Sequence, residues 1–166
     1  IMKKARGLVL AEFSMCNIDR FKSFYQAAQE TGRIMVVDTK YAFLLDRLNE
    51  IIPGLPDPRT DPGLKVYYKL AKSRTINEAD YKKFEREYFP NRVTYEDIRP
   101  NQKKYVLVTG FNKLMELVYN HPDEADYIYS QSEPYPEGEE NEDQRRGLEN
   151  WLQHFGITFH KAHCSG

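Results

Sequence analysis

Residues 7–37 read GLVLAEFSMCNIDRFKSFYQAAQETGRIMVV, and this stretch predicts a strand, a helix and a second strand. Its first run, residues 7–13, is almost entirely apolar, which is typical of a strand buried on both faces. Asn17 is a preferred N-cap residue, and the apolar positions from Ile18 to Ala28 recur with the period of an amphipathic helix. Gly32 is expected to end that helix, and residues 34–37 form the next apolar run.

The rest of the chain continues the alternation of strand and helix. Further strands are predicted at 65–69, 105–110, 127–129 and 157–159, the first of them more exposed than the others. Helices are predicted from Asp38 or Thr39 to residue 48, and over 77–88, 112–119 and 143–155, the last with Trp151 buried. We therefore expect a three-layer α/β/α, Rossmann-like domain with a mostly parallel sheet, in which residues 53–104 are a local elaboration.

Composition restricts the class of protein. The 166 residues suffice for one domain with a hydrophobic core, and the formal charge of -1 argues against a generally basic nucleic-acid binder. No apolar run is long enough to cross a bilayer, so no membrane partner is expected. Cys16 and Cys164 lie near opposite ends and form no disulfide framework, which makes the cytoplasm the simplest compartment.

The two ends of the sequence suggest a piece of a larger protein. The chain enters its first strand within seven residues, and it stops in a loop that reads His163-Cys164-Ser165-Gly166. Histidine, serine and glycine are residue types that hold metals, phosphates and tight turns. We therefore expect residues 1–166 to be a single domain excised from a longer chain.

Polar residues follow the predicted strands where each one ends, at the edge of a parallel sheet where ligands gather. Hydroxyls, imidazoles and helix N-terminal amides at this rim suit an anion or a phosphoryl group. For Ser14, Asn17 and Thr39, helix capping is the simpler alternative. The rim residues are Ser14, Asn17, Asp38, Thr39, Thr109, Gly110, Ser130, Gln131, Ser132, His160 and His163.

No stronger chemical motif appears. The sequence has no glycine-rich nucleotide loop and no Gly-x-Ser-x-Gly elbow. His160 and His163 have no supporting ligands for a closed zinc site, and Cys164 has no orienting carboxylate nearby in sequence. The basic residues and tyrosines between 65 and 104 suit either a phosphodiester backbone or an ordinary solvated surface. No catalytic residue and no metal ligand is assigned.

Two segments together resemble a known family. Residues 11–21, with Ala27-Ala28 and Thr31-Gly32-Arg33, are similar to the opening strand and helix of the β-CASP domain. Residues 130–134, the helix with Trp151 and residues 163–166 are similar to its closing portion. Such domains are insertions in metallo-β-lactamase-fold nucleases, and the similarity is to ribonuclease J and its archaeal relatives. It spans nearly the whole chain in order, with a poor match over residues 53–104.

The resemblance implies a function for the parent protein. Family members are metal-dependent hydrolases with two zinc ions on a His-x-His-x-Asp-His motif, which this sequence lacks, so the fragment alone is expected to be inactive and to hold no cofactor. Its implied partners are RNA and the metallo-β-lactamase domain of the same chain. The RNA 5′ phosphate would lie on His163 and Ser165, with Ser130 and Ser132 beside them and Ser14 and Asn17 as further rim contacts.

Two alternatives remain open at this point. One is a Rossmann-like module that binds a small phosphorylated ligand at the same rim. The other is a scaffold whose exposed faces form a homodimer.

Overall fold

A computed structural model describes residues 1–131 and 139–162 of the chain, with side chains from residue 142 onward in the second range. Within these ranges one sheet runs in the order β4-β3-β2-β5-β1-β6-β7, and every neighbouring pair of strands is parallel. The predicted α/β fold with three layers is confirmed. The strands are β1 (Val9–Glu12), β2 (Ile34–Asp38), β3 (Leu64–Tyr67), β4 (Arg92–Val93), β5 (Tyr105–Val108), β6 (Asp126–Tyr129) and β7 (Thr158–Lys161).

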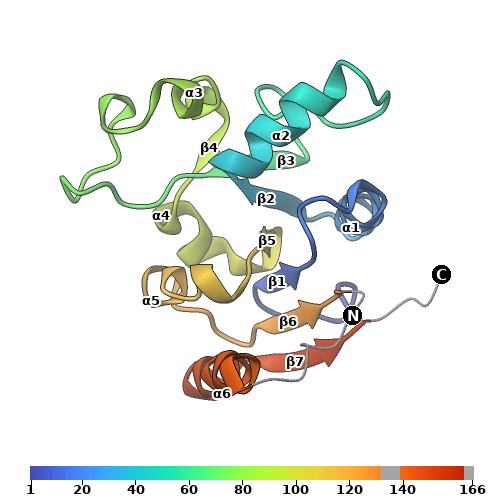
Figure 1. The fold of residues 1–166 in the computed structure, drawn as a ribbon, viewed down its shortest axis with the longest axis vertical. Coiled ribbons are helices and arrows are strands. Elements are labelled where there is room, and N and C mark those ends of the chain that lie inside the picture. The colour runs from blue at the N-terminus through green and yellow to red at the C-terminus, as the bar shows by residue number, and fades with distance from the viewer. Residues whose placement is uncertain (132–138, 163–166) are drawn as a thin grey trace.

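Helices cover both faces of the sheet (Figure 1). One face lies under α1 (Ile18–Glu30) and α2 (Thr39–Asn49), and the other under α4 (Tyr95–Ile98), α5 (Glu116–Asn120) and α6 (Glu139–His154). Val9 of β1 packs with the first pair of helices, whereas Leu10 packs with the second set. Side chains alternate between the faces of a strand, so a central strand covered on both faces must be apolar throughout.

The first strand–helix–strand unit forms as the sequence predicts. The Asn17 side chain accepts a hydrogen bond from the Arg20 backbone N–H at 2.9 Å and caps α1. Gly32 follows the end of the helix with φ at +68°, a conformation that glycine adopts without strain. Asp38, not Thr39, caps α2, because its side chain accepts from the Tyr41 N–H at 2.7 Å.

Within residues 53–104 the predicted strand forms, but its predicted exposure and the helix predicted at 77–88 are wrong. β3 is an interior strand between β2 and β4 and is buried, not exposed. The helix predicted at 77–88 is replaced by short pieces, namely η1 (Glu78–Asp80), α3 (Lys83–Arg86) and η2 (Phe89–Asn91). Arg86 donates to the carbonyls of Ala79 and Tyr81, at 2.9 and 2.8 Å, which a continuous helix would need as acceptors. The segment therefore bends around its own side chain.

The C-terminal part follows the prediction with small shifts. Leu148 and Leu152 of α6 are buried, whereas Trp151 is only half-buried and stacks on Phe155 with ring centroids 5.9 Å apart. β7 pairs with β6 at the edge of the sheet, so the predicted neighbouring of these two strands is confirmed. The helix predicted at 112–119 is divided into η4 (Phe111–Lys113) and α5.

The 3-10 segment η3 (Arg99–Lys104) leads into β5. None of the helices in the described ranges combines the length and the apolar character required to cross a membrane.

Candidate functional site

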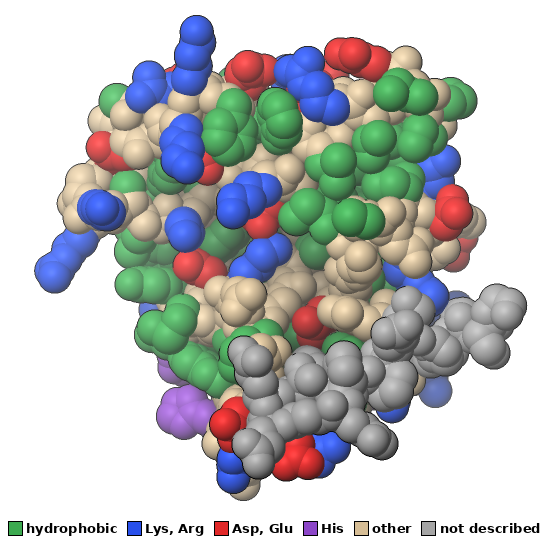
Figure 2. Space-filling view, in the orientation of Figure 1, with side chains coloured by type: hydrophobic (Ala, Val, Ile, Leu, Met, Phe, Trp, Pro, Cys, Tyr) green, Lys and Arg blue, Asp and Glu red, His purple; other side chains and the backbone are tan. Residues whose placement is uncertain are grey.

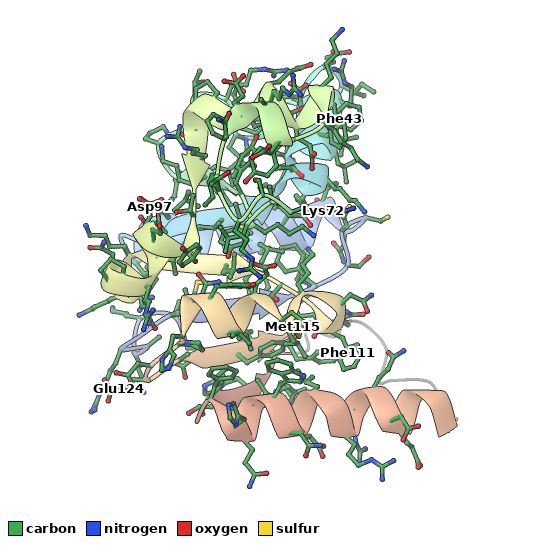
Figure 3. The ribbon with its side chains drawn as sticks, turned by 90° about the vertical axis from the view of Figure 1, so that its left-hand side faces the viewer. Phe43, Lys72, Asp97, Phe111, Met115 and Glu124 are labelled. Atoms are coloured by element: carbon green, nitrogen blue, oxygen red, sulfur yellow. The ribbon has the colours of Figure 1, made fainter. Side chains whose placement is uncertain are left out.

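The carboxyl ends of the strands meet on the side of the molecule that faces the viewer in Figures 1 and 2. In Figure 2, Lys and Arg side chains lie among hydrophobic ones across the upper part of this face. Figure 3 shows the same edge from the side: Lys72 and Phe111 lie at one side of the molecule, and Asp97 and Glu124 at the opposite side. Lys72 and Phe111 follow β3 and β5, whereas Asp97 and Glu124 precede β5 and β6. We call the first side the carboxyl edge.

The topology makes a crevice at this edge. From β1 the chain leaves to α1 on one face, and from its neighbour β5 it leaves to α5 on the other face. Strands whose connections diverge in this way leave a gap outside their carboxyl ends, where open α/β sheets bind ligands. A hollow of about 460 Å³ lies there, and we call it the crevice pocket. It is lined by residues that follow β1, β5 and β6, together with Gln144 of α6.

Glu12 is the buried carboxylate among the residues that line the crevice pocket. It is the last residue of β1 and is only 6% exposed. The Tyr127 hydroxyl donates to its Oε2 at 2.5 Å, and the Gln131 amide donates to its Oε1 at 3.3 Å. Burial raises the pKa of the Glu12 carboxyl, and the hydrogen bonds from Tyr127, the Phe111 backbone and Gln131 offset part of that increase. The pocket thus has an acceptor fixed by two neighbours.

Ser130 lies at the same edge but is already engaged. Its hydroxyl donates to the Ala162 carbonyl at 2.8 Å, and its Oγ accepts from Nη1 of Arg20 at 3.1 Å. A hydroxyl has a single proton to donate, so in this arrangement Ser130 positions Arg20 and does not offer a proton to an anion. The role of Ser130 toward phosphate stays a prediction.

Arg20 is the residue that the sequence patterns missed. It is half-buried in the first turn of α1, and none of the carboxylates whose side chains are described lies within ion-pairing distance of it. A cation at a helix N-terminus is electrostatically unfavourable, because the helix dipole places positive charge there. This unfavourable position was the signal in the sequence that could have identified Arg20. A cation at a helix N-terminus without a partner carboxylate is suited to bind an external anion.

The other predicted rim residues have mixed positions. Ser14 is exposed and lines the crevice pocket and also a second hollow of about 500 Å³ beside the start of α1. Asn17 lines that second hollow while capping α1. Thr39 does not cap a helix; its hydroxyl donates to Glu85 at 2.7 Å. Thr109 and Gly110 line the crevice pocket.

His160 was predicted at the rim, and the structure places it elsewhere. It lies inside β7, and its Nε2 is 2.6 Å from Oδ1 of Asp126, the first residue of β6. The predicted Ser132, His163 and Ser165, and also Cys164, lie outside the described residues. Among the residues that are described, no group of three or more His, Cys, Asp or Glu side chains could hold a metal ion.

Comparison with known proteins leaves the family open. A scan against protein-family models found no match, and a search of curated proteins found none either.

Proposed function

We propose that this chain is the substrate-clamping domain of a zinc-dependent, RNA-processing hydrolase of the β-CASP type, and that it holds RNA by the 5′ phosphate at the carboxyl edge. The proposal rests on the two segments that resemble this family, at residues 11–33 and 130–134, and on the contact between them, since Arg20 of the first donates to Ser130 of the second. The two zinc ions and the cleavage step belong to the metallo-β-lactamase domain of the parent chain, in the cytoplasm. This chain binds and orients the RNA end.

One observation carries the proposal, namely the Arg20 guanidinium. An arginine side chain has five N–H donors in a rigid fork, and Ser130 accepts only one of them. Hydrogen bonds from arginine to phosphate are charge-assisted and are stronger than those between neutral groups. A guanidinium without a partner carboxylate among the described side chains, fixed by a buried serine, is therefore suited to a terminal phosphate.

The test compares two RNAs that differ only at the 5′ end. A short single-stranded RNA, labelled at its 3′ end, carries either a 5′ monophosphate or a 5′ hydroxyl, and its affinity for the chain is measured by fluorescence anisotropy. The monophosphate should bind roughly tenfold more tightly, the scale of one hydrogen bond between charged groups. Arg20→Ala should abolish this preference, and Arg20→Lys should restore only part of it, because lysine lacks the planar fork.

Arg6→Ala is the matched control. Arg6 pairs with Glu124 at the opposite edge of the sheet, 3.3 Å away, so its removal makes the same change in net charge without touching the carboxyl edge. The preference for the 5′ phosphate should survive in this variant. Equal affinity of the unmodified chain for both RNAs, or an unchanged preference in Arg20→Ala, would refute the proposal.

A second candidate function is favoured by the size of the crevice pocket. About 460 Å³ is within the range of pockets that hold small ligands, so the chain could be a binding module for a small phosphorylated metabolite. Length dependence separates the two candidates. An RNA clamp should bind a 5′-phosphorylated decamer more tightly than a nucleoside monophosphate, whereas a small-ligand module should bind both equally or prefer the smaller molecule.

A further inference from the structure

Basic side chains gather in the connection between β3 and β4. Residues 69–86 contain six basic and three acidic residues, a formal charge of +3. Because the whole chain carries -1, the remaining residues together carry -4. All six basic side chains are exposed, and none forms an ion pair with a carboxylate in the described part of the chain. We call them the basic surface: Lys69, Lys72, Arg74, Lys82, Lys83 and Arg86.

Two of the acidic side chains in this segment fix its fold instead of pairing with the basic ones. The Asp80 carboxylate accepts from the hydroxyls of Ser73 and Thr75, at 2.7 and 3.2 Å. The Glu85 carboxylate accepts from the Thr39 hydroxyl at 2.7 Å, which ties α3 to the start of α2. Since these carboxylates bond to neutral hydroxyls, the lysines and arginines beside them extend into solvent, where they can meet an anionic partner.

A row of cations joins the basic surface to the proposed phosphate site. Arg20 follows β1, Lys40 follows β2 and Lys69 follows β3, so all three belong to the carboxyl edge. Lys40 is exposed in the first turn of α2 and, like Arg20, has no ion-pair partner among the side chains that the structure describes. Tyr68 of the β3–β4 connection is buried in the same apolar cluster as Phe21 of α1, so the row runs along one face of the sheet.

The length of this row exceeds what a single phosphate can cover. In the sheet, β5 and β2 separate β1 from β3. Three strand spacings of about 4.8 Å each therefore place the two ends of the row roughly 14 Å apart. An RNA whose first phosphate binds Arg20 reaches the basic surface only with the nucleotides that follow.

Aromatic rings lie beside the basic surface. Phe84 of α3 packs edge-on against Phe43 of α2 with ring centroids 5.5 Å apart, and Phe43 is 39% exposed. Figure 3 labels Phe43 and Lys72 on the same side of the molecule, and Figure 2 shows hydrophobic side chains between the Lys and Arg side chains of this face. Cations that follow a backbone, with rings on which bases stack, are typical of surfaces that bind single-stranded nucleic acid.

We infer that the body of a single-stranded RNA runs along the carboxyl edge from Arg20, past Lys40, to the basic surface, with its 5′ end at Arg20 and its 3′ portion on α3. This inference rests on the proposed function, which fixes the position of the 5′ end. It adds a direction and a minimum length of RNA, and neither follows from a phosphate site alone.

The experiment measures the salt dependence of RNA binding by fluorescence anisotropy. The probes are a decamer and a dinucleotide, each with a 5′ phosphate and a 3′ label. The double variant Lys82→Gln with Lys83→Gln should make the slope of log Kd against log salt shallower by about 1.4 for the decamer, because each contact to a single-stranded phosphate contributes about 0.7. The dinucleotide is too short to reach α3, so its affinity should not change.

The double variant Lys103→Gln with Lys104→Gln is the matched control. These lysines are also adjacent and exposed, and neither is ion-paired within the described ranges, but they precede β5 and lie at the opposite edge. The slope for the decamer should stay as it is in the unmodified chain. Lys40→Gln tests the row independently of α3 and should make the slope shallower by about 0.7.

An aspartate decapeptide tests for an anionic partner of another class. Phe43→Ala should weaken binding of the RNA decamer roughly fivefold or more, because a base loses its stacking ring, and should not affect binding of the peptide. Either a peptide that binds as tightly as the RNA or an unchanged RNA affinity in Phe43→Ala would overturn the assignment to RNA.

The outcomes separate this inference from the proposed function. An unchanged slope in the α3 double variant, in a chain that still prefers the 5′ phosphate, would overturn the path of the RNA and leave the clamp standing. A shallower slope in a chain without any 5′ preference would support the RNA surface and refute the 5′ phosphate site.

Discussion

Two parts of the molecule are stabilised in different ways. The regular part comprises residues 7–49 and 105–131, and the irregular part comprises residues 53–104. In the first, strands and helices bury whole apolar side chains such as Val9, Leu10 and Phe21. In the second, apolar side chains such as Val66 and Tyr88 are buried as well, and a buried polar residue adds hydrogen bonds to backbone carbonyls. Asn91 donates to the carbonyls of Pro58 and Leu64 at 3.0 and 2.9 Å, and it accepts from the Lys65 ammonium at 2.5 Å.

A charged cluster completes the irregular part. Arg59 donates to both carboxylate oxygens of Asp46 in α2 and to Glu87, the latter at 2.8 Å. Its guanidinium lies 5.3 Å from the centroid of the Tyr88 ring, and the Tyr88 hydroxyl donates to Asp46 at 3.2 Å. The difference teaches that where the regular backbone ladder ends, side chains satisfy the backbone carbonyls, and the apolar periodicity that predicts elements disappears.

The first test of this difference is a substitution of Phe21 in the regular part. Its ring is fully buried and packs on Tyr25 and Tyr41, with centroids 5.9 and 5.4 Å away. Phe21→Ala should lower the free energy of unfolding by about 3–5 kcal/mol, measured by urea denaturation, because it leaves a cavity in the core. Phe43→Ala is the control at an exposed ring and should cost far less. Similar costs for the two variants would mean that apolar packing does not dominate the regular part.

The irregular part should depend on Asn91. Asn91→Ala removes the amide from two backbone carbonyls and leaves the Lys65 ammonium without its acceptor, so it should cost about 2–3 kcal/mol. Limited proteolysis should then cut within residues 53–104 before the rest of the chain. Asn101→Ala is the control, since the Asn101 amide makes a single exposed bond to the Asp97 carbonyl, at 3.1 Å. Unchanged proteolysis in Asn91→Ala would show that other contacts hold this part.

The sequence predicts the regular part well for a physical reason. β1, β2 and β5 are covered on both faces, so an apolar run is both necessary and visible. The predicted helix over 77–88 failed because its charge pattern, acidic at the start and basic at the end, fits a helix, while the Arg86 side chain takes carbonyls that the helix would use. Charge order indicates a direction for a helix but does not supply an apolar face.

The sequence predicted where the candidate site lies, but it did not identify the charged residues that form it. The rule that ligands gather at the carboxyl ends of strands pointed to the edge where Gln131 lines the crevice pocket and Ser130 holds Arg20, while their binding roles stay predictions. It gave no weight to Glu12, which stood inside an apolar run and was treated as part of a strand. A single carboxylate within a run that is buried on both faces must be compensated by hydrogen bonds, and that requirement was the unused signal. The bond from Tyr127 joins residues 115 positions apart, which no local pattern reveals.

The two parts should also differ in their response to pH, and Glu12 sets the response at the carboxyl edge. Burial raises its pKa in the folded state, with Tyr127, Gln131 and Lys113 acting in the opposite direction. Above the unfolded pKa of about 4.3 the folded chain therefore binds more protons, and stability falls as pH rises through the raised folded pKa. One proton contributes at most about 1.4 kcal/mol per pH unit. Glu12→Gln should flatten this slope in urea titrations; an unchanged slope would contradict the assignment.

Asp46 should give the opposite and smaller response in the irregular part. The hydrogen bonds from Arg59 hold the pKa of its carboxyl below the usual value, helped by Tyr88 and Arg47, while burial acts against them. In the unfolded chain this carboxyl titrates near pH 3.9, so between the two pKa values the unfolded state binds more protons. The contribution of Asp46 is thus present above about pH 4 and is lost as pH falls through the lower folded pKa.

Arg59 is 37% exposed, and solvent screening limits the effect to about 1 kcal/mol. Arg59→Ala should therefore lower stability at neutral pH by about that amount and flatten the loss below pH 4, while the fall in stability at higher pH that belongs to Glu12 stays as it was. A change in the upper slope instead would mean that the two parts of the molecule are coupled through their charges.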